Sequence, residues 1–177
     1  LRLDGALYCW GDNIDGQLGT GDRFRTLAPV RIGTDTWSAV SAGERHTCGL
    51  RADGALYCWG YNAYGQLGTG DTTDAHAPVR IGTDTWRAVA AGESHTCGLR
   101  SDGALYCWGD NYYGQLGTRD RSPRLDPARI GTDSWSTVSA GSEHTCGLRS
   151  DGALHCWGEN ASGRLGTGDT TDALAPL

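Results

Sequence analysis

Short apolar runs alternate with glycine-rich and polar turns along the whole chain, and this pattern repeats every 49 residues. In one repeat the runs are 37–43, 46–51, 55–60 and 77–81. Runs of this length, bounded by turn residues, predict β-strands, and the turn Ala52-Asp53-Gly54 predicts a tight hairpin between the second and third runs. We therefore expect an all-β protein built from units of four antiparallel strands.

The repeat is strict and contains no insertion or deletion. The phrase Cys-Trp-Gly followed by Asn-x-x-Gly-x-Leu-Gly occurs four times, at Trp10, Trp59, Trp108 and Trp157. A fixed period of this length is typical of propellers, solenoids and arrays, whose units bury their apolar sides against one another. The expected units are a partial one with only the later strands, 1–30, and three whole ones, 31–79, 80–128 and 129–177. We expect the chain to be an excerpt of a longer one, preceded by Trp-x-x-Val-x-Ala-Gly-x-x-His-Thr-Cys-Gly.

The hairpin register makes a chemical prediction about the cysteines. If residue 51 pairs with 55, then 48 lies opposite 58, with Cα atoms roughly 4.5 Å apart, at the short end of what a disulfide tolerates. The predicted disulfides are Cys48–Cys58, Cys97–Cys107 and Cys146–Cys156, with Cys9 unpaired. Buried free thiols are the alternative, and a zinc site is a weaker one because the Cys-x(2-4)-Cys spacing is missing. Disulfides indicate an oxidising location: extracellular, cell surface or periplasmic.

Composition narrows the function classes. The chain has 28 glycines, no methionine and a formal net charge of -6, and all fifteen basic residues are arginines. The arginines form no basic stripe, so a nucleic-acid partner is not expected. No run approaches the ~20 apolar residues of a membrane helix, so membrane insertion is not expected either. We attribute the arginine bias to a GC-rich, bacterial genome.

Radial arrangement of four-stranded units gives a β-propeller, and a stacked solenoid is the alternative. The small residues of 39–43 suit an innermost strand, where neighbouring blades crowd together. Leu50 and Leu56 share one side of the predicted sheet with the cysteines, while Tyr57 and Trp59 share the other side. Both sides are apolar, as expected for a blade packed between two neighbours.

One long motif then points to a family. The string Val40-x-Ala42-Gly43-x-x-His46-x-x-x-Leu50-x-x-Asp53-Gly54-x-Leu56-Tyr57-x-Trp59-Gly60-x-Asn62-x-x-Gly65-Gln66-Leu67-Gly68 resembles the repeat of the regulator of chromosome condensation family. The resemblance implies a seven-bladed propeller, which at this period needs about 343 residues. It also implies several functions. The eukaryotic founder promotes nucleotide exchange on a nuclear small GTPase, whereas secreted bacterial relatives inhibit β-lactamases with loops on one face. The paired cysteines favour the secreted bacterial type.

Positions that differ between the near-identical units are candidates for recognition. Two sites vary, the Asn-x-x-Gly loop and the turn before the repeated histidine, and the resemblance implies that both lie on one face. Their tyrosines suit protein contacts, because tyrosine is enriched in binding hot spots. The alternative is relaxed selection on solvated loops. The candidate residues are Ile14, Asp15, Glu44, Arg45, Tyr61, Tyr64, Glu93, Tyr112, Tyr113 and Glu143.

A third variable site is the outer connection, with Arg23-Phe24-Arg25 and Arg119-Asp120-Arg121, which we expect to pack between blades or against another chain. The repeated histidines His46, His95 and His144 are interpreted as hydrogen-bonded structural groups instead of metal ligands or bases. His76 and His155 do not repeat and have no obvious partner, and the aspartates of Gly70-Asp71-Thr72-Thr73-Asp74 miss the spacing of a calcium loop.

No unique constellation of nucleophile, base and stabiliser stands out, so an enzyme, a metal and a cofactor are not expected. The sequence favours a protein-recognition scaffold in an exported bacterial protein, whose partner is another protein or further copies of itself. The alternatives are a structural array that forms a surface layer or fibre, and a guanine-nucleotide-exchange-factor-like regulator.

Overall fold

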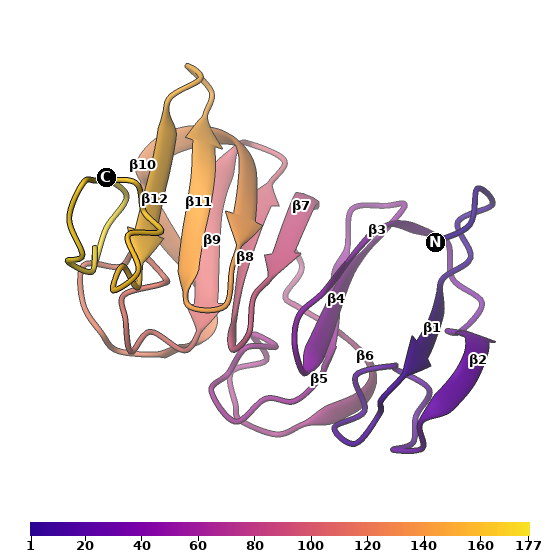
Figure 1. The fold of residues 1–177 in the computed structure, drawn as a ribbon. Helices are drawn as coiled ribbons and strands as arrows, with labels where there is room; N and C mark the ends of the chain where they lie inside the picture. The colour runs from indigo at the N-terminus through magenta and orange to yellow at the C-terminus, as the bar shows by residue number, and fades with distance from the viewer.

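The computed structural model describes residues 1–177 as twelve β-strands without a helix, arranged in an open row of blades (Figure 1). The strands are β1 (Tyr8–Gly11), β2 (Thr26–Arg31), β3 (Trp37–Ala42), β4 (His46–Arg51), β5 (Leu56–Gly60), β6 (Ala75–Arg80), β7 (Trp86–Ala91), β8 (His95–Arg100), β9 (Ala104–Gly109), β10 (Arg124–Ala140), β11 (His144–Arg149) and β12 (Leu154–Gly158). We call β1–β2 blade 1, β3–β6 blade 2, β7–β9 with the start of β10 blade 3, and the end of β10 with β11–β12 blade 4. The prediction of an all-β fold made of antiparallel blades is confirmed.

The expected hairpin register holds in every complete hairpin. In blade 2 the amide of Arg51 donates to the carbonyl of Ala55 at 2.9 Å, and Cys48 pairs directly with Cys58. The two sulfurs are bonded and the Cα atoms lie 4.1 Å apart, a distance that the other two pairs repeat. Cys9 is the free cysteine. The three disulfides predicted from the register are therefore present.

Strand β10 departs from the expected pattern because it runs without a break from the outer edge of blade 3 to the inner edge of blade 4. It pairs with β9 in its first part and with β11 in its second, which joins six strands into one sheet. The backbone path is nevertheless that of the other blades, since Gly131 has φ +60° where Gly33 and Gly82 have +61° and +59°. The same crossover is thus made as a continuous strand here and as two strands elsewhere.

Each blade shields the aromatic side of the next one. The disulfide side of blade 2, with Leu50 and Leu56, packs against Trp86 and Trp108 of blade 3 in one buried cluster. Trp108 is fully buried, as are its counterparts Trp59 and Trp157. At the two ends of the row this shielding is missing, so Trp10 is 59% exposed and Leu154 is 65% exposed. Blade-to-blade burial, at about 25 cal/mol per Å² of apolar surface, is what holds the row together.

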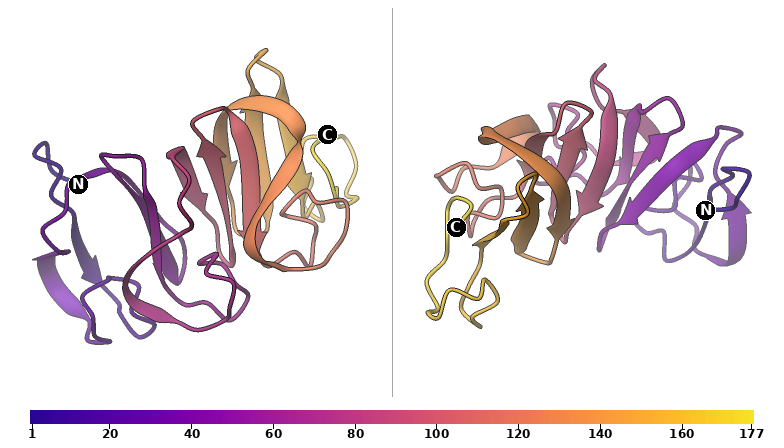
Figure 2. Two further views of the ribbon diagram at one scale, coloured as in Figure 1. Left: turned by 180° about the vertical axis from the view of Figure 1, so that it is seen from behind. Right: turned by 90° about the horizontal axis from the view of Figure 1, so that it is seen from above.

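The first strands of neighbouring blades meet at the inner side of the row (Figure 2). Strand β3 contacts β7, and β7 contacts β10. The amide of Ala91 donates to the hydroxyl of Ser41 at 3.0 Å, and the amide of Glu44 donates to the carbonyl of Gly92 at 3.3 Å. The small residues of these strands permit this approach. None of the elements is a helix long and apolar enough to cross a membrane.

Candidate protein-binding face

A repeated asparagine builds the loop that follows each Trp-Gly. Asn62 is buried, its Oδ1 accepts from the amide of Leu67 at 2.9 Å, and its Nδ2 donates to the hydroxyl of Thr69 and to the carbonyls of Asp71 and Thr73. The other three loops have the same bonds around Asn13, Asn111 and Asn160. The asparagine is therefore a turn former that fixes the loop backbone, while the two residues after it are free to vary.

The glycine of each of the first three loops permits close contact with the following blade. A Cβ placed on Gly114, which has φ +83°, would lie 2.5 Å from a side-chain carbon of Leu174 and 3.0 Å from its Cα. Gly65 and Gly16 are in the same situation against Leu125 and His76. Only glycine suits both the left-handed backbone and this contact. The loops are thus anchored on both sides of a blade junction.

The variable side chains of these loops differ in exposure. Tyr112 is 66% exposed, Ile14 is 64% exposed and Tyr64 is 47% exposed, whereas Tyr61 and Tyr113 are partly buried. Asp15 is buried, with 6% exposure, so it lies below the surface that the others form. The rings gather in two edge-to-face pairs, Tyr61 with Tyr64 at 6.4 Å and Tyr112 with Tyr113 at 4.9 Å between centroids.

The turn before each repeated histidine lies at the same end of the blade as the Asn-x-x-Gly loop. The amide of Tyr61 donates to the carbonyl of Arg45 at 2.9 Å, and the amides of Asp110 and Glu159 make the same bond to Ser94 and Glu143. Glu44 is exposed, while Glu93 and Glu143 are partly buried. We call this end, with its loops and turns, the loop face. It unites all ten candidate residues named from the sequence on one end of the blades.

Arg45 links two blades on the loop face. Its Nε and Nη2 donate to the two carboxylate oxygens of Asp15 at 2.8 and 2.9 Å, and its Cζ lies 4.0 Å from the centroid of the Tyr61 ring. The bidentate bond to Asp15 raises the pKa of Arg45. Arg45 therefore completes the first junction, between blades 1 and 2, with a paired and stacked guanidinium. The pairing was not foreseen from the sequence, although Asp15 and Arg45 are both variable and opposite in charge.

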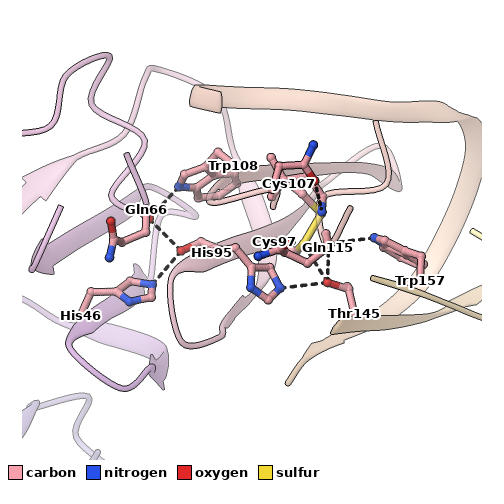
Figure 3. The surroundings of a disulfide bond; sticks show 12 residues. His46, Gln66, His95, Cys97, Cys107, Trp108, Gln115, Thr145 and Trp157 are labelled. Atoms are coloured by element: carbon pink, nitrogen blue, oxygen red, sulfur yellow. Dashed lines mark hydrogen bonds between the residues drawn. A yellow bond between two sulfur atoms is a disulfide. The ribbon is translucent and has the colours of Figure 1, made fainter. Parts of the chain in front are cut away.

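A hydrogen-bonded relay lies below the loop face at the second and third junctions (Figure 3). At the third junction, between blades 3 and 4, the Gln115 carbonyl accepts from the Thr145 hydroxyl at 2.8 Å and from the Trp157 indole at 2.9 Å. The same hydroxyl lies 2.9 Å from Nε2 of His95. Because the hydroxyl donates to Gln115, it accepts from His95, so Nε2 of the imidazole carries a proton.

The second junction, between blades 2 and 3, repeats this relay with His46, Thr96, Gln66 and Trp108. Burial lowers the pKa of His46 to about 4 and that of His95 to about 3, which keeps both rings neutral. The interpretation as structural, hydrogen-bonded groups is therefore confirmed for His46 and His95, whereas the partly buried ring of His144 makes no hydrogen bond. No group of three or more His, Cys, Asp or Glu side chains is placed to hold a metal ion.

The outer connections bridge neighbouring blades. Arg23 donates to Asp74 at 3.2 Å and to Nε2 of His76 at 2.9 Å. Arg121 donates to Asp172 of the next blade at 3.2 Å and also to the carbonyl of Tyr112, so it supports an exposed loop from behind. The expectation that this variable site packs between blades is confirmed for Arg23 and Arg121, whereas Phe24 is 78% exposed. His155 lies edge-to-face with Trp135, and its ring nitrogens have no hydrogen-bond partner.

Comparison with known proteins agrees with this architecture. A family model described as an RCC1-like domain matches residues 1–177. Yeast RCC1 (Prp20) in its complex with Kap60 is 26% identical, with a TM-score of 0.87 over 98% of this chain and 44% of that chain. The structure of Prp20p from Saccharomyces cerevisiae, described with its binding properties to Gsp1p and histones, is 25% identical, with a TM-score of 0.85 over 96% of this chain and 45% of that one.

An extracellular protein also matches. The ectodomain of the receptor kinase CR4 from Physcomitrella patens is 26% identical, with a TM-score of 0.57 over 89% of this chain and 36% of that chain. This chain thus spans less than half the length of these solved structures. No curated protein matches it.

Proposed function

The chain belongs to the RCC1-like domain family, and we propose that it is a non-catalytic scaffold that recognises another protein through its loop face. One observation carries this proposal: four loops with the same asparagine-fixed backbone present different side chains, and the most exposed of these are large. Tyr112, Tyr64 and Ile14 supply contact area on a rigid support, so little conformational entropy is lost on binding.

We also propose the setting in which this scaffold works. The three disulfides favour an oxidising location outside the cytoplasm, and the similarity to a receptor ectodomain supports it. An exported bacterial protein fits the composition, and we propose that such blades belong to a ring of seven, as the family resemblance implies. The structures of Prp20 concern binding to Kap60, Gsp1p and histones, which supports protein recognition as the common theme.

Two other functions are alternatives: a structural array and a regulator of a GTPase. A structural array is favoured by the blade-to-blade packing that joins β4 to β7 and β3 to β7 within the chain. A regulator of a GTPase is favoured by the likeness to Prp20 and disfavoured by the disulfides. Light scattering over a hundredfold concentration range separates the array from the scaffold, because an array grows with concentration and a scaffold keeps one mass.

The test of recognition uses the full chain as bait for proteins secreted by its source organism. A captured protein is identified, purified and titrated against the chain by calorimetry. In the double variant Tyr64→Ala/Tyr112→Ala we expect affinity to fall at least tenfold, since hot-spot tyrosines contribute about 2 kcal/mol or more. The matched control, Thr83→Ala/Thr132→Ala, changes exposed residues at the opposite end of the blades. Equal affinities of the two variants for the captured protein would contradict binding through the loop face.

A further inference from the structure

We propose that the third junction of the loop face binds an arginine side chain presented by the partner, at the surface beside Tyr113 and Glu143. The inference rests on the proposed function, because it assigns the chemistry of the partner group that this face recognises. It is argued from a comparison of equivalent positions within the chain itself.

The first junction shows that this geometry accommodates a guanidinium. There Arg45 lies between the carboxylate of Asp15 and the ring of Tyr61, and it makes both a bidentate ion pair and a close stacking contact. A planar guanidinium satisfies the two contacts at once, which an ammonium group does not. The chain thus contains an occupied example of the site, in which one blade supplies the cation to its neighbour.

The third junction has the same backbone and different side chains. The amide of Glu159 donates to the carbonyl of Glu143 at 2.9 Å, as Tyr61 does to Arg45. Two repeats, or 98 residues, on from the first junction, Tyr113 stands in place of Asp15, Glu143 in place of Arg45 and Glu159 in place of Tyr61. A carboxylate and an aromatic ring are therefore retained with their positions exchanged, and Glu143 adds a second carboxylate at the position from which Arg45 supplies the guanidinium.

Unneutralised negative charge collects at this junction. Glu143 forms no ion pair, and Arg164, at 2.6 Å from Oε2, pairs with Glu159. The Glu159 side chain is 9% exposed, and its Oε2 accepts no well-aligned hydrogen bond despite the ion pair. Burial and the charges of Glu93 and Glu159 raise the pKa of Glu143, and the charge of Glu143 in turn raises that of Tyr113. The charge of Asp110 also raises the pKa of Glu143, and the charge of Arg164 lowers it.

The aromatic part of the site is accessible from solvent. Tyr112, 66% exposed, meets Tyr113 edge-to-face with centroids 4.9 Å apart. The bond from Arg121 to the Tyr112 carbonyl holds this pair in place. A guanidinium that approaches Glu143 can therefore stack on a tyrosine ring while it pairs with the carboxylate, as Arg45 does within the chain.

The test uses acetyl-Gly-Arg-Gly-amide as probe, with the citrulline peptide as a neutral analogue of the same shape. Titrations followed by backbone NMR should shift the amides of Tyr112, Tyr113 and Glu143, and citrulline should bind at least tenfold more weakly. Glu143→Gln should weaken the arginine peptide about tenfold, the magnitude of one hydrogen bond to a charged group. Asp126→Asn removes a charge from an exposed position of the outer strand β10 that is not among the candidate residues, and we expect affinity to stay within twofold.

A second variant tests the comparison itself. Arg45→Ala removes the internal guanidinium from Asp15 and Tyr61, so the arginine peptide should then also shift the amide of Tyr61. Equal binding of the citrulline peptide, unchanged affinity in Glu143→Gln, or no shift at Tyr61 in Arg45→Ala would each overturn the proposal. If a captured protein still depends on Tyr64 and Tyr112 in that case, only this inference fails and the proposed function stands.

Discussion

The threonine of the junction relay offers a prediction with a control inside the chain. Thr96→Val replaces the hydroxyl by a methyl group of similar size, so the carbonyl of Gln66 retains only the Trp108 indole and His46 Nε2 loses its partner. Thr47 makes the equivalent bond to Gln17 at 2.8 Å, yet it has no histidine partner. The two substitutions therefore differ by the orphaned imidazole.

The magnitudes follow from the bonds that are lost. A buried polar group left without a partner costs about 1–3 kcal/mol, and a net hydrogen bond contributes about 1 kcal/mol. We expect Thr47→Val to lower the free energy of unfolding by about 1 kcal/mol and Thr96→Val by about 3 kcal/mol. Thr96→Ser keeps the hydroxyl and loses one methyl group, so it should cost about 1 kcal/mol.

Urea unfolding followed by tryptophan fluorescence measures these differences, with the disulfides intact in every variant. The free energies are compared only where the m-value is unchanged, since loss of cooperativity in a repeat array would invalidate the comparison. Equal effects of Thr96→Val and Thr47→Val would refute the assignment of His46 as a donor to Thr96. Equal effects of Thr96→Val and Thr96→Ser would refute the role of the hydroxyl itself.

Three further predictions address acid stability, the disulfides and the loop glycines. The pKa values of His46 and His95 are lowered from 6.5 to about 4 and about 3, so the unfolded chain takes up protons first as the pH falls. The free energy of unfolding should therefore decrease from pH 7 to pH 5 by roughly 2 kcal/mol per histidine. A urea midpoint that stays the same over this range would contradict the prediction. Thiol titration in denaturant should count one thiol before reduction and seven after it, whereas seven thiols at the outset would disprove the disulfides. The double substitution Cys97→Ala/Cys107→Ala should lower the free energy of unfolding by about 3 kcal/mol, because the unfolded chain loses the constraint of a closed loop. Gly114→Ala should destabilise the protein more than Gly168→Ala, because both have positive φ but only Gly114 faces Leu174; equal thermal midpoints would show that the contact is unimportant.

The strand pattern and the disulfides could be predicted from the sequence because both depend on local periodicity. The Asp53-Gly54 turn fixes the hairpin register, and the register alone places Cys48 opposite Cys58. The burial of Trp108 likewise follows from a sheet that is apolar on both sides and repeated. Continuity of β10 could not be predicted, because the Ile-Gly-Thr-Asp crossover has the same sequence in blades where the strand breaks.

The candidate site was predictable only as a set of variable positions. Their placement on one face depended on a family resemblance, and their individual roles depended on contacts between blades. Asp15 was expected at the binding surface, yet it is buried under Arg45, because the interacting pair is 30 residues apart and belongs to two different repeats. The role of Arg121 likewise depends on distant partners, because it bonds to Asp172 of the next blade and to the carbonyl of Tyr112 in a loop of its own blade.

Hydroxyl-radical footprinting of the chain with and without its captured partner tests protein recognition by the loop face most directly. We expect the partner to protect Tyr64, Tyr112 and Tyr113 from oxidation and to leave Trp10 and Leu154, at the two ends of the row, unaffected. Protection confined to Trp10 and Leu154, with the tyrosines as reactive as in the free chain, would contradict recognition by the loops and favour assembly through the blade ends.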